Sequence, residues 1–257
     1  MIAVIGLGEA GGAIARDLAA AGAGVRGFDP APAGVPEGVQ AASDERDAAA
    51  GADVVLSVNS AAVAVRVAEA VAPALDRDSL FADLNTAAPR LEREVAAVVG
   101  ASGAAFADVA LMAPVPGRGL HTPALVSGPG AGRFASTFGP LGMPITPVGS
   151  EAGTASARKL ARSVFAKGLA AAVGEALAAG ERLGCEDWLY ADIERTLSAA
   201  DGALLRRLID GSRRHAVRRA EEMGAAVALL EELEIEPRTA AAARAWLGSL
   251  AEGAVAR

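Results

Sequence analysis

The chain has 257 residues, of which 52% are hydrophobic, so it is long enough for one large or two medium-sized domains with a sizeable core. A net charge of -7 and a pI near 5.0 disfavour general nucleic-acid binding, which requires a basic field. The single cysteine, Cys185, excludes an intramolecular disulfide, and the two histidines form no ligand motif, so we predict no metal site. The apolar start MIAVIG is too short for a signal peptide, and we find no stretch of about 18 apolar residues free of glycine and charge. We therefore expect a soluble, cytoplasmic protein without a membrane span.

The first 29 residues have the pattern of a dinucleotide-binding unit. IAVIG is typical of a buried strand, and a glycine motif of the form G-x-G-x-x-G follows it and opens a helix. A second strand ends at Asp29, 18 residues after Gly11, where an acid is expected to accept the ribose 2′-OH. The predicted cofactor-binding residues here are Gly6, Leu7, Gly8, Glu9, Ala10, Gly11 and Asp29. The predicted cofactor is NAD or NADP, and Asp29 favours NAD because a carboxylate repels a 2′-phosphate.

The following segments continue an alternation of strands and helices. Strands are predicted at 53–57, 79–84 and 104–109, with a short helix opened by Ser43 or Asp44, a helix capped by Ser60, and another near 89–99. Repeated units of this kind predict a doubly wound parallel sheet, whose ligands lie beyond the carboxyl ends of the strands. This rule places further residues along the cofactor, namely Val58, Asn59, Ser60, Asn85 and Thr86. The two asparagines have an equally good interpretation as turn or capping residues.

Residues 113–132 are rich in proline and glycine, which predicts an irregular loop, then a short strand (ALVSG) and another turn. Loops at the carboxyl edge of a sheet often line a substrate site. Arg118 is the one charged residue of the Pro/Gly segment and is a candidate to hold a carboxylate, whereas His121 is interpreted as a polar loop residue. A last short strand is predicted at 145–149.

Residues 149–183 predict one long helix without proline, and this helix contains both lysines of the chain. Of the 24 basic residues, 22 are Arg, and only Lys159 and Lys167 are Lys. A desolvated lysine can exchange a proton near neutral pH, whereas arginine cannot, so a proton-transfer role is the functional interpretation of this usage. The alternative is chance survival of two surface lysines. Ser163 lies one turn after Lys159 and can hydrogen-bond a substrate or steady the lysine.

The remainder of the chain predicts helices only, including one over 212–233. We therefore expect a Rossmann domain at 1–149 and an all-α domain at 150–257, with an interdomain helix at about 152–183. Within the Arg-rich segment 212–223, Arg214, Arg218 and Glu222 share one face of the predicted helix. This face is either a solvated set of ion pairs or a cationic wall that binds an anionic substrate. The Ala- and Leu-rich helical half has limited means to bury its own apolar faces, which predicts a homodimer or higher oligomer.

Several of these motifs resemble the β-hydroxyacid dehydrogenase superfamily, which includes 3-hydroxyisobutyrate and 6-phosphogluconate dehydrogenases, and most of all its short DUF1932-type branch. The similar segments are GLGEAG, Asn85-Thr86-x-x-Pro89, VPGRGLHTP, AGTASARKLARS and RHAVRRAEEM. AGTASARKLARS resembles the family's G-x-G-x-x-x-K-x-x-x-N, which implies that Lys159 is the catalytic acid/base. The family's Ser-Gly-Gly substrate loop corresponds to Pro116-Gly117-Arg118, so Gly117 and Arg118 are implied to bind substrate without the usual serine.

Three other departures accompany this one. Ser163 replaces the family's asparagine, Ala155 replaces the second glycine of the lysine motif, and the later Lys-Asp pair is lost in the Arg-rich helix. The predicted function is an NAD(P)-dependent oxidoreductase acting on a small, anionic hydroxyacid-type substrate, with the pKa of Lys159 lowered by burial and by the cationic nicotinamide. Two other classes stay open: an imine reductase, and a catalytically idle NAD(P)-binding regulator.

Overall fold

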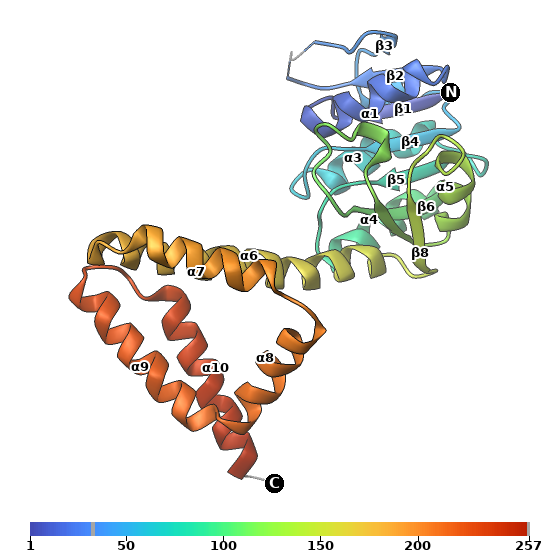
Figure 1. Cartoon of the computed structure of the whole chain (residues 1–257). Helices are drawn as coiled ribbons and strands as arrows, with labels where there is room; N and C mark the ends of the chain where they lie inside the picture. The colour runs from blue at the N-terminus through green and yellow to red at the C-terminus, as the bar shows by residue number, and fades with distance from the viewer. Residues whose placement is uncertain (32–33, 256–257) are drawn as a thin grey trace. The chain divides into compact units, whose positions relative to one another are not determined.

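The structure is a computed structural model that describes residues 1–31 and 34–255. The chain forms two compact units, Met1–Arg162 and Ser163–Arg257 (Figure 1). The long helix predicted at 149–183 is present as α6 (Thr154–Leu183), which starts in the first unit and continues into the second.

The first unit contains an eight-stranded sheet with the order β3-β2-β1-β4-β5-β6-β7-β8. Its strands are β1 (Ile2–Ile5), β2 (Val25–Phe28), β3 (Val39–Ala41), β4 (Val54–Ser57), β5 (Leu80–Asp83), β6 (Ala105–Leu111), β7 (Ala124–Ser127) and β8 (Ile145–Gly149). All neighbours pair in parallel except β6 and β7. The order reverses between β1 and β4, so the predicted doubly wound Rossmann sheet is confirmed, and its switch point lies at these two strands.

Helices cover both faces of this sheet. The helices of the first unit are α1 (Glu9–Ala20), α2 (Glu45–Ala49), α3 (Ala64–Val71), α4 (Pro89–Ala101) and α5 (Ala131–Phe138), with the short 3₁₀ helices η1 (Ala72–Ala74) and η2 (Gly119–His121). Buried side chains of α1 and α5 pack on one face, and those of α2, α3 and α4 pack on the other. The central strands are therefore buried on both sides, which explains why they read as nearly continuous apolar runs.

Three local features differ from the sequence-based expectations. Helix α5 was not expected, since a turn was predicted as far as Gly132 and no element between it and the strand at 145–149; Phe134 and Phe138 lie one helical turn apart, are buried in the core and contact each other in a tilted arrangement with ring centroids 4.6 Å apart. Strand β3 was not expected, since it has only three residues. Ser60 does not cap α3: that helix begins one turn later, after Val63, without a side-chain cap. Asp44 does cap α2, because its carboxylate accepts a hydrogen bond from the backbone N–H of Asp47 at 2.7 Å.

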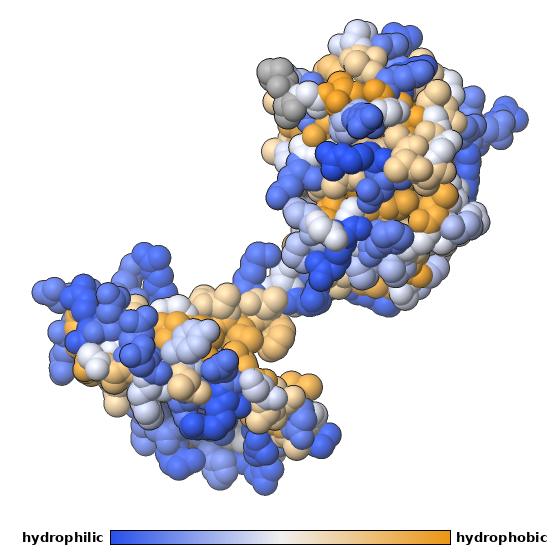
Figure 2. Space-filling view, turned by 45° about the horizontal axis from the view of Figure 1, so that its top comes forward, coloured by the Kyte–Doolittle hydropathy of each residue, from blue (hydrophilic) through white to orange (hydrophobic). Residues whose placement is uncertain are grey.

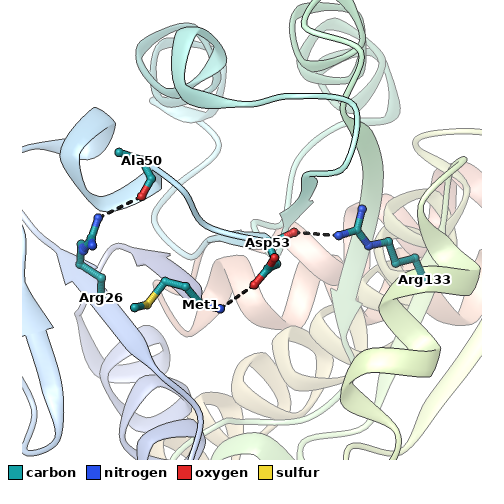
Figure 3. Close-up of polar contacts among 5 residues, drawn as sticks. All are labelled: Met1, Arg26, Ala50, Asp53 and Arg133. Atoms are coloured by element: carbon teal, nitrogen blue, oxygen red, sulfur yellow. Dashed lines mark hydrogen bonds and ion pairs between the residues drawn. The ribbon is translucent and has the colours of Figure 1, made fainter.

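The amino edge of the sheet is closed by its own polar contacts (Figure 3). The Met1 ammonium group contacts the Asp53 carboxylate at 2.6 Å, and this hydrogen bond lowers the pKa of Asp53. Arg133 donates to the Asp53 carbonyl oxygen at 3.1 Å, and Arg26 donates to the Ala50 carbonyl oxygen at 3.1 Å. These contacts tie β1, β4 and their flanking segments together at the edge opposite the carboxyl ends.

The second unit consists of the remainder of α6 and four further helices. These are α7 (Glu186–Ser198), α8 (Gly202–Arg214), α9 (Ala216–Glu232) and α10 (Arg238–Val255). The expectation of a single helix over 212–233 is wrong. The helix is interrupted at His215, which lies between the end of α8 and the start of α9. Asp201 caps α8 with its carboxylate, and α9 packs along α10.

Among the described helices, α6 alone is long and apolar enough to cross a membrane by length and composition. It nevertheless contains Lys167 and Glu175, and the Glu175 carboxylate accepts hydrogen bonds from the backbone N–H groups of Thr239 and Ala240 at 2.8 and 2.7 Å. A charged side chain that caps the start of α10 is a feature of packing between helices of a protein, and Glu175 thus joins α6 to α10.

Candidate functional site

A cavity of ≈ 520 Å³ opens at the carboxyl ends of β1, β4 and β5, next to the point where the strand order reverses. Ligands of doubly wound sheets bind at this position. The residues that line it are Ile5, Gly6, Gly8, Glu9, Ala10, Gly11, Asp29, Pro30, Glu45, Val58, Asn59, Val63, Arg66, Val67, Leu84, Asn85, Thr86, Leu111, Ala113, Val115 and Lys159. The cavity thus brings the glycine motif, Asp29, the two asparagines and Lys159 together.

The glycines of the motif have the geometry that a phosphate-binding turn needs. Gly6 has a φ of +97°, and a Cβ there would lie 2.1 Å from the Val58 carbonyl oxygen. A Cβ on Gly11 would lie 1.9 Å from the Gly6 carbonyl oxygen, so both positions require glycine for close packing of strand and helix. Gly8 is exposed and has no atom within 4 Å of its Cβ position, which leaves its backbone open to an approaching ligand. These residues fit the pyrophosphate of a dinucleotide, at the N-terminus of α1.

Asp29 is held in place at the end of β2 by two backbone donors. Its Oδ2 accepts a hydrogen bond from the Leu7 N–H at 2.7 Å, and its Oδ1 accepts one from the Ala31 N–H at 2.8 Å. Each carboxylate oxygen keeps further acceptor capacity for a hydroxyl donor. Leu7 itself packs into the core and does not line the cavity; its contribution is the backbone N–H that orients Asp29.

Asn59 and Asn85 form a joined pair beyond β4 and β5. The Asn85 Oδ1 accepts from the Asn59 N–H at 2.7 Å, and the Asn85 Nδ2 donates to the Asn59 Oδ1 at 3.1 Å. Both side-chain amides also donate to the Ser57 Oγ, at 3.2 and 3.1 Å. The two asparagines thus fix the turns after β4 and β5 and also line the cavity, and their contact with a cofactor stays a prediction. Ser60 does not line the cavity; its N–H donates to the Asn59 Oδ1 at 2.9 Å.

Lys159 is half-buried, lies on the second turn of α6 and lines the cavity. Three other predicted substrate-binding residues, Ser163, Arg214 and Arg218, belong to the second unit. Arg214 ends α8, whereas Arg218 lies on α9 and contacts Glu222 at 3.7 Å. The expected common face of Arg214, Arg218 and Glu222 on one helix is therefore wrong, and the solvated ion-pair interpretation applies to Arg218 and Glu222.

The loop predicted to bind substrate is anchored to the glycine-motif helix. Asp17 of α1 accepts a hydrogen bond from the Leu120 N–H at 2.8 Å, and a Cβ on Gly119 would lie 1.7 Å from the same carboxylate oxygen. Gly117 and Arg118 are exposed and are not among the residues that line the cavity, whereas Ala113 and Val115 of this loop are. The Arg118 guanidinium lies near the Pro114 carbonyl oxygen at 3.5 Å.

Two groups of residues were not identified from the sequence. Arg66 and Glu45 line the cavity as an ion pair with a 3.0 Å separation, although they are 21 positions apart on α3 and α2. Asp83, Glu92 and Asp108 form a buried carboxyl cluster beneath the start of α6. The sequence contains a signal for this cluster in the tripeptide Phe-Ala-Asp, which occurs at 81–83 and at 106–108. An acidic residue within an apolar strand is buried, and a buried acid needs a hydrogen-bond or charge partner.

Burial raises the pKa of Glu92 to about 9, with additional repulsion from Asp83 and Asp108, and burial raises the pKa of Asp83 to about 7. Asp83 Oδ2 and Glu92 Oε2 have no hydrogen-bond partner within the described part of the chain. The described residues contain no group of three or more His, Cys, Asp and Glu arranged to hold a metal ion.

Comparison with known proteins agrees with this architecture. Residues 1–118 match the NAD binding domain of 6-phosphogluconate dehydrogenase, and residues 181–250 match a domain of unknown function, DUF1932. The 3-hydroxyisobutyrate dehydrogenase of Pseudomonas aeruginosa is 28% identical over 214 residues, which span 79% of this chain and 72% of that enzyme.

Solved structures extend the similarity over nearly the whole chain. A conserved hypothetical protein from Sinorhizobium meliloti 1021 is 31% identical, with a TM-score of 0.64 and coverage of 96% of this chain and 87% of that one. An imine reductase from Myxococcus stipitatus in complex with NADP+ shares the fold, with a TM-score of 0.84 at 22% identity and coverage of 98% and 94%. With an NAD(P)-binding Rossmann unit, a DUF1932 segment and a hydroxyacid dehydrogenase relative, the chain belongs to the β-hydroxyacid dehydrogenase superfamily, in its DUF1932-type branch.

Proposed function

We propose that the protein is an NAD(P)-dependent oxidoreductase that interconverts a small hydroxyacid-type substrate and its carbonyl form, with Lys159 as the general acid/base. The observation that carries this proposal is the shared cavity: Lys159 lines the same space as Gly8 and Asp29. A dinucleotide bound along the glycine motif and the asparagine pair reaches toward the wall that holds Lys159. The family relationship supports a dehydrogenase or reductase, and the choice of a CH–OH group is our proposal.

The proposed chemistry requires one proton transfer by the protein. A bound nicotinamide supplies or accepts the hydride. The Lys159 amine takes the hydroxyl proton during oxidation, and its ammonium form returns a proton to the alkoxide oxygen during reduction. Leu84, Leu111 and Val115 surround this part of the cavity with apolar side chains and keep water away from the transfer. The amide groups of Asn59 and Asn85 give this wall a fixed geometry because they bond each other and Ser57.

NAD is the proposed cofactor in preference to NADP. Asp29 lines the cavity with both carboxylate oxygens oriented by backbone donors, which suits a free ribose 2′-OH. Arg66, which lines the cavity along with Lys159, is engaged with Glu45 at 3.0 Å, so a 2′-phosphate gains little from it. Dissociation constants measured for NADH and NADPH test this preference, and tighter binding of NADPH contradicts it.

An anionic substrate needs a cation near Lys159, and Arg162 is the candidate that we propose. Its Nη1 donates to the Met112 carbonyl oxygen at 2.8 Å, and Met112 precedes Ala113, which lines the cavity. Arg162 follows Lys159 by about one helical turn, so their side chains leave α6 on neighbouring sides. Arg118, which the sequence favoured, is exposed outside the cavity lining. An Arg162→Gln variant with a raised KM for acids but not for neutral alcohols supports this assignment.

Two other functions remain as alternatives. The structural likeness to an imine reductase, at 22% identity, concerns the fold, and an imine substrate is a second candidate on that ground. A regulator that binds the cofactor without turnover is the third. A screen of hydroxyacids, neutral alcohols, oxoacids and cyclic imines, followed by the absorbance of the reduced nicotinamide, separates the three functions. Turnover of hydroxyacids or oxoacids indicates the proposed dehydrogenase, and turnover of imines indicates an imine reductase. No turnover of any compound indicates a regulator. Turnover of imines alone contradicts the CH–OH proposal.

We also propose that the protein is a homodimer or higher oligomer, located in the cytoplasm, and that its second unit forms the interface. The support comes from the apolar surface of that unit: Phe165, Trp188 and Trp246 are 69%, 67% and 54% exposed in the single chain. Apolar residues are visible at the surface of the helical unit in Figure 2. An isolated soluble chain rarely leaves so many large apolar side chains in water.

A further inference from the structure

A row of four buried polar side chains runs across four neighbouring strands of the sheet, at the carboxyl ends of β4 and β5. Ser57, Asp83, Asp108 and Ser127 are direct neighbours in register on β4, β5, β6 and β7, and none of them is exposed to solvent. The strands on either side of this row carry apolar side chains, so the row is costly unless it is fully hydrogen-bonded. At one end the row contacts the asparagine pair that lines the cavity, and at the other end it contacts the start of α6. These two contacts suggest a functional role for the row.

Asp108 is the acceptor for the buried first turn of α6. Its Oδ2 accepts hydrogen bonds from the N–H groups of Gly153 and Ser156, at 3.0 and 3.1 Å, and from the Ser127 hydroxyl at 2.9 Å. Its Oδ1 accepts the Ser156 hydroxyl at 2.7 Å. The Ser127 Oγ in turn accepts the N–H of Ala155 at 3.0 Å. Asp108 and Ser127 thus accept hydrogen bonds from three backbone N–H groups at the start of α6.

The arrangement replaces the usual side-chain cap of a helix with a residue from the sheet. The first N–H groups of a helix have no partner inside the helix, and here they are buried, so each must find an acceptor. A carboxylate at this position also interacts favourably with the partial positive charge of the helix N-terminus. Gly153 makes the approach possible: it has a φ of +93°, and a Cβ there would lie 2.8 Å from the Pro89 carbonyl oxygen.

The other two carboxyl groups of the cluster differ from Asp108 in chemistry. Glu92 has a pKa raised to about 9 by burial and by its neighbours, so it holds a proton at neutral pH. Its Oε1 lies 3.4 Å from the Ser156 Oγ. Asp83 makes no hydrogen bond to α6; its Oδ1 accepts the N–H of Asn85 at 2.9 Å. Asp108 therefore lies where the N–H groups at the start of α6 converge, and the protonated carboxyl group of Glu92 lies beside Ser156.

We propose that Asp108 is the positioning residue for Lys159, because Asp108 and its neighbour Ser127 hold the first turn of α6 against the sheet, next to the cofactor cavity. Lys159 follows Ser156 by three residues, which is about one turn. Ser57, at the other end of the row, accepts hydrogen bonds from both Asn59 and Asn85. The asparagine pair and the start of α6 are thus each held by hydrogen bonds to one end of the same row of residues. The proposal rests on the proposed role of Lys159 in proton transfer.

The chain offers a direct probe of this proposal because it has only two lysines. Reductive methylation of the full-length protein with ¹³C-formaldehyde labels Lys159, Lys167 and the N-terminal amine, and these give separate NMR signals that Lys→Arg variants assign. Addition of NAD+ is expected to shift the Lys159 signal, since Lys159 lines the cavity, and to leave the Lys167 signal unchanged. The matched pair of variants is Asp108→Asn and Asp83→Asn, the same change at two buried positions that face each other on adjacent strands.

In Asp108→Asn, we expect NAD+ to bind with a dissociation constant within about threefold of the wild type, while the shift of the Lys159 signal falls to less than half. With a substrate from the screen, kcat falls about 10- to 100-fold, the effect expected for a small misplacement of a catalytic group. Asp83→Asn is expected to keep the Lys159 shift. An unchanged Lys159 shift in Asp108→Asn, or an equal loss in Asp83→Asn, overturns the proposal.

Two further variants keep the test decisive. If Asp108→Asn does not fold, Ser127→Ala removes the acceptor of the Ala155 N–H and one donor to Asp108, and a wild-type Lys159 shift in that variant also overturns the proposal. Lys159→Met separates the two proposals. Full turnover by Lys159→Met refutes the acid/base role, whereas the NMR result on lysine placement is independent of turnover. Where Lys159→Met is impaired, Asp108→Asn added to it should lower the residual rate no further, and an additional loss shows that Asp108 does not act through Lys159.

Discussion

The two units of this chain differ in how completely each buries its own apolar side chains. In the first unit, both faces of an eight-stranded sheet are covered, and the exposed large hydrophobic residues are Met1 and Val35. Among the described residues of the second unit, the buried hydrophobic ones are Ala216, Leu230, Ala240 and Leu247, and thirteen large hydrophobic side chains are exposed. The first unit thus covers its own core, whereas the second leaves large apolar side chains exposed, which is the basis of the interface proposed for it.

This difference assigns separate roles to the two halves of α6. Its first turns belong to the nucleotide-binding unit, where Asp108 and Ser127 hold their N–H groups and Lys159 lines the cavity. Its later turns carry exposed Val164, Phe165 and Leu169. The same helix therefore carries a chemical site at one end and apolar surface at the other. Lys159 lies in the part of α6 that belongs to the first unit and Lys167 in the part that belongs to the second, so the same substitution at the two lysines compares the two parts directly.

The largest expected effect is on turnover, with the same substitution made in each unit. Lys159→Arg keeps the positive charge but removes the titratable amine, and loss of general acid/base catalysis typically costs a factor of about 10² to 10⁴. Lys167→Arg is the matched control on the same helix, in the second unit, and should keep kcat within about threefold of the wild type. Steady-state kinetics with a substrate from the screen measure both. If Lys167→Arg is the more damaging change, proton transfer does not belong to Lys159.

The next effect concerns assembly. Placing a charge in an interface core typically weakens association by about 2–4 kcal/mol, so Phe165→Glu or Trp246→Glu should raise the dimer dissociation constant on the order of 10²-fold. Light scattering over a dilution series measures this. Both tryptophans of the chain, Trp188 and Trp246, lie in the second unit, so their fluorescence reports on that unit alone. In the wild type at micromolar concentration we expect weak quenching by acrylamide, and stronger quenching on dilution.

The matched control for assembly is Val35→Glu. Val35 is an exposed apolar residue of the first unit, at 43% exposure, and lies outside the proposed interface. This variant should dimerise like the wild type. A monomeric wild-type protein at micromolar concentration, or equal weakening by Val35→Glu, contradicts the view of the second unit as half of an interface.

The sequence predicts the first unit better than the second, for physical reasons. Buried parallel strands and the turn geometry of Gly6 and Gly11 leave local patterns, so the sheet and the glycine motif could be recognised. The ion pair of Glu45 and Arg66 joins positions 21 residues apart, and no local pattern encodes that contact. The helical half has weak apolar periodicity because Ala dominates it, so the break at His215 was missed and Arg214 and Arg218 were placed on one face.

The buried carboxyl groups give the first unit a pH dependence that can be tested separately. The pKa of Glu92 is raised from 4.5 to about 9 in the folded protein, so the folded state keeps a proton that the unfolded state releases. The free energy of unfolding therefore falls as pH rises from about 4.5 to 9, by up to about 1.4 kcal/mol per pH unit. Asp83, with a pKa of about 7, contributes in the same direction up to about pH 8, so the interval from pH 8 to 9 belongs mainly to Glu92.

Glu92→Gln keeps the shape of the neutral carboxyl group and removes this dependence. We expect the wild-type melting temperature to fall by several degrees between pH 7 and 9, and that of Glu92→Gln to fall clearly less. Glu94→Gln, an exposed change on the same helix, serves as the control and should behave like the wild type. Differential scanning calorimetry at constant ionic strength measures all three. Identical pH profiles for the wild type and Glu92→Gln show that Glu92 is ionised in the folded protein.

The smallest effect sharpens the description of the cofactor site in the first unit. Glu45 holds Arg66 at 3.0 Å, and its side chain is 14% exposed whereas that of Arg66 is 57% exposed. Glu45→Gln removes the carboxylate that competes with a 2′-phosphate for this guanidinium. A partly exposed ion pair contributes about 0.2–1 kcal/mol, so NADPH binding should tighten by roughly 1.5- to 5-fold, with NADH binding unchanged. Titration calorimetry measures both constants. Glu94→Gln breaks a comparable pair with Arg90 outside the cavity and should alter neither. If Glu45→Gln tightens the binding of both cofactors equally, Arg66 does not contact the 2′-phosphate, and the change reflects the overall charge of the protein. Only a contact at the 2′ position can discriminate between the two dinucleotides.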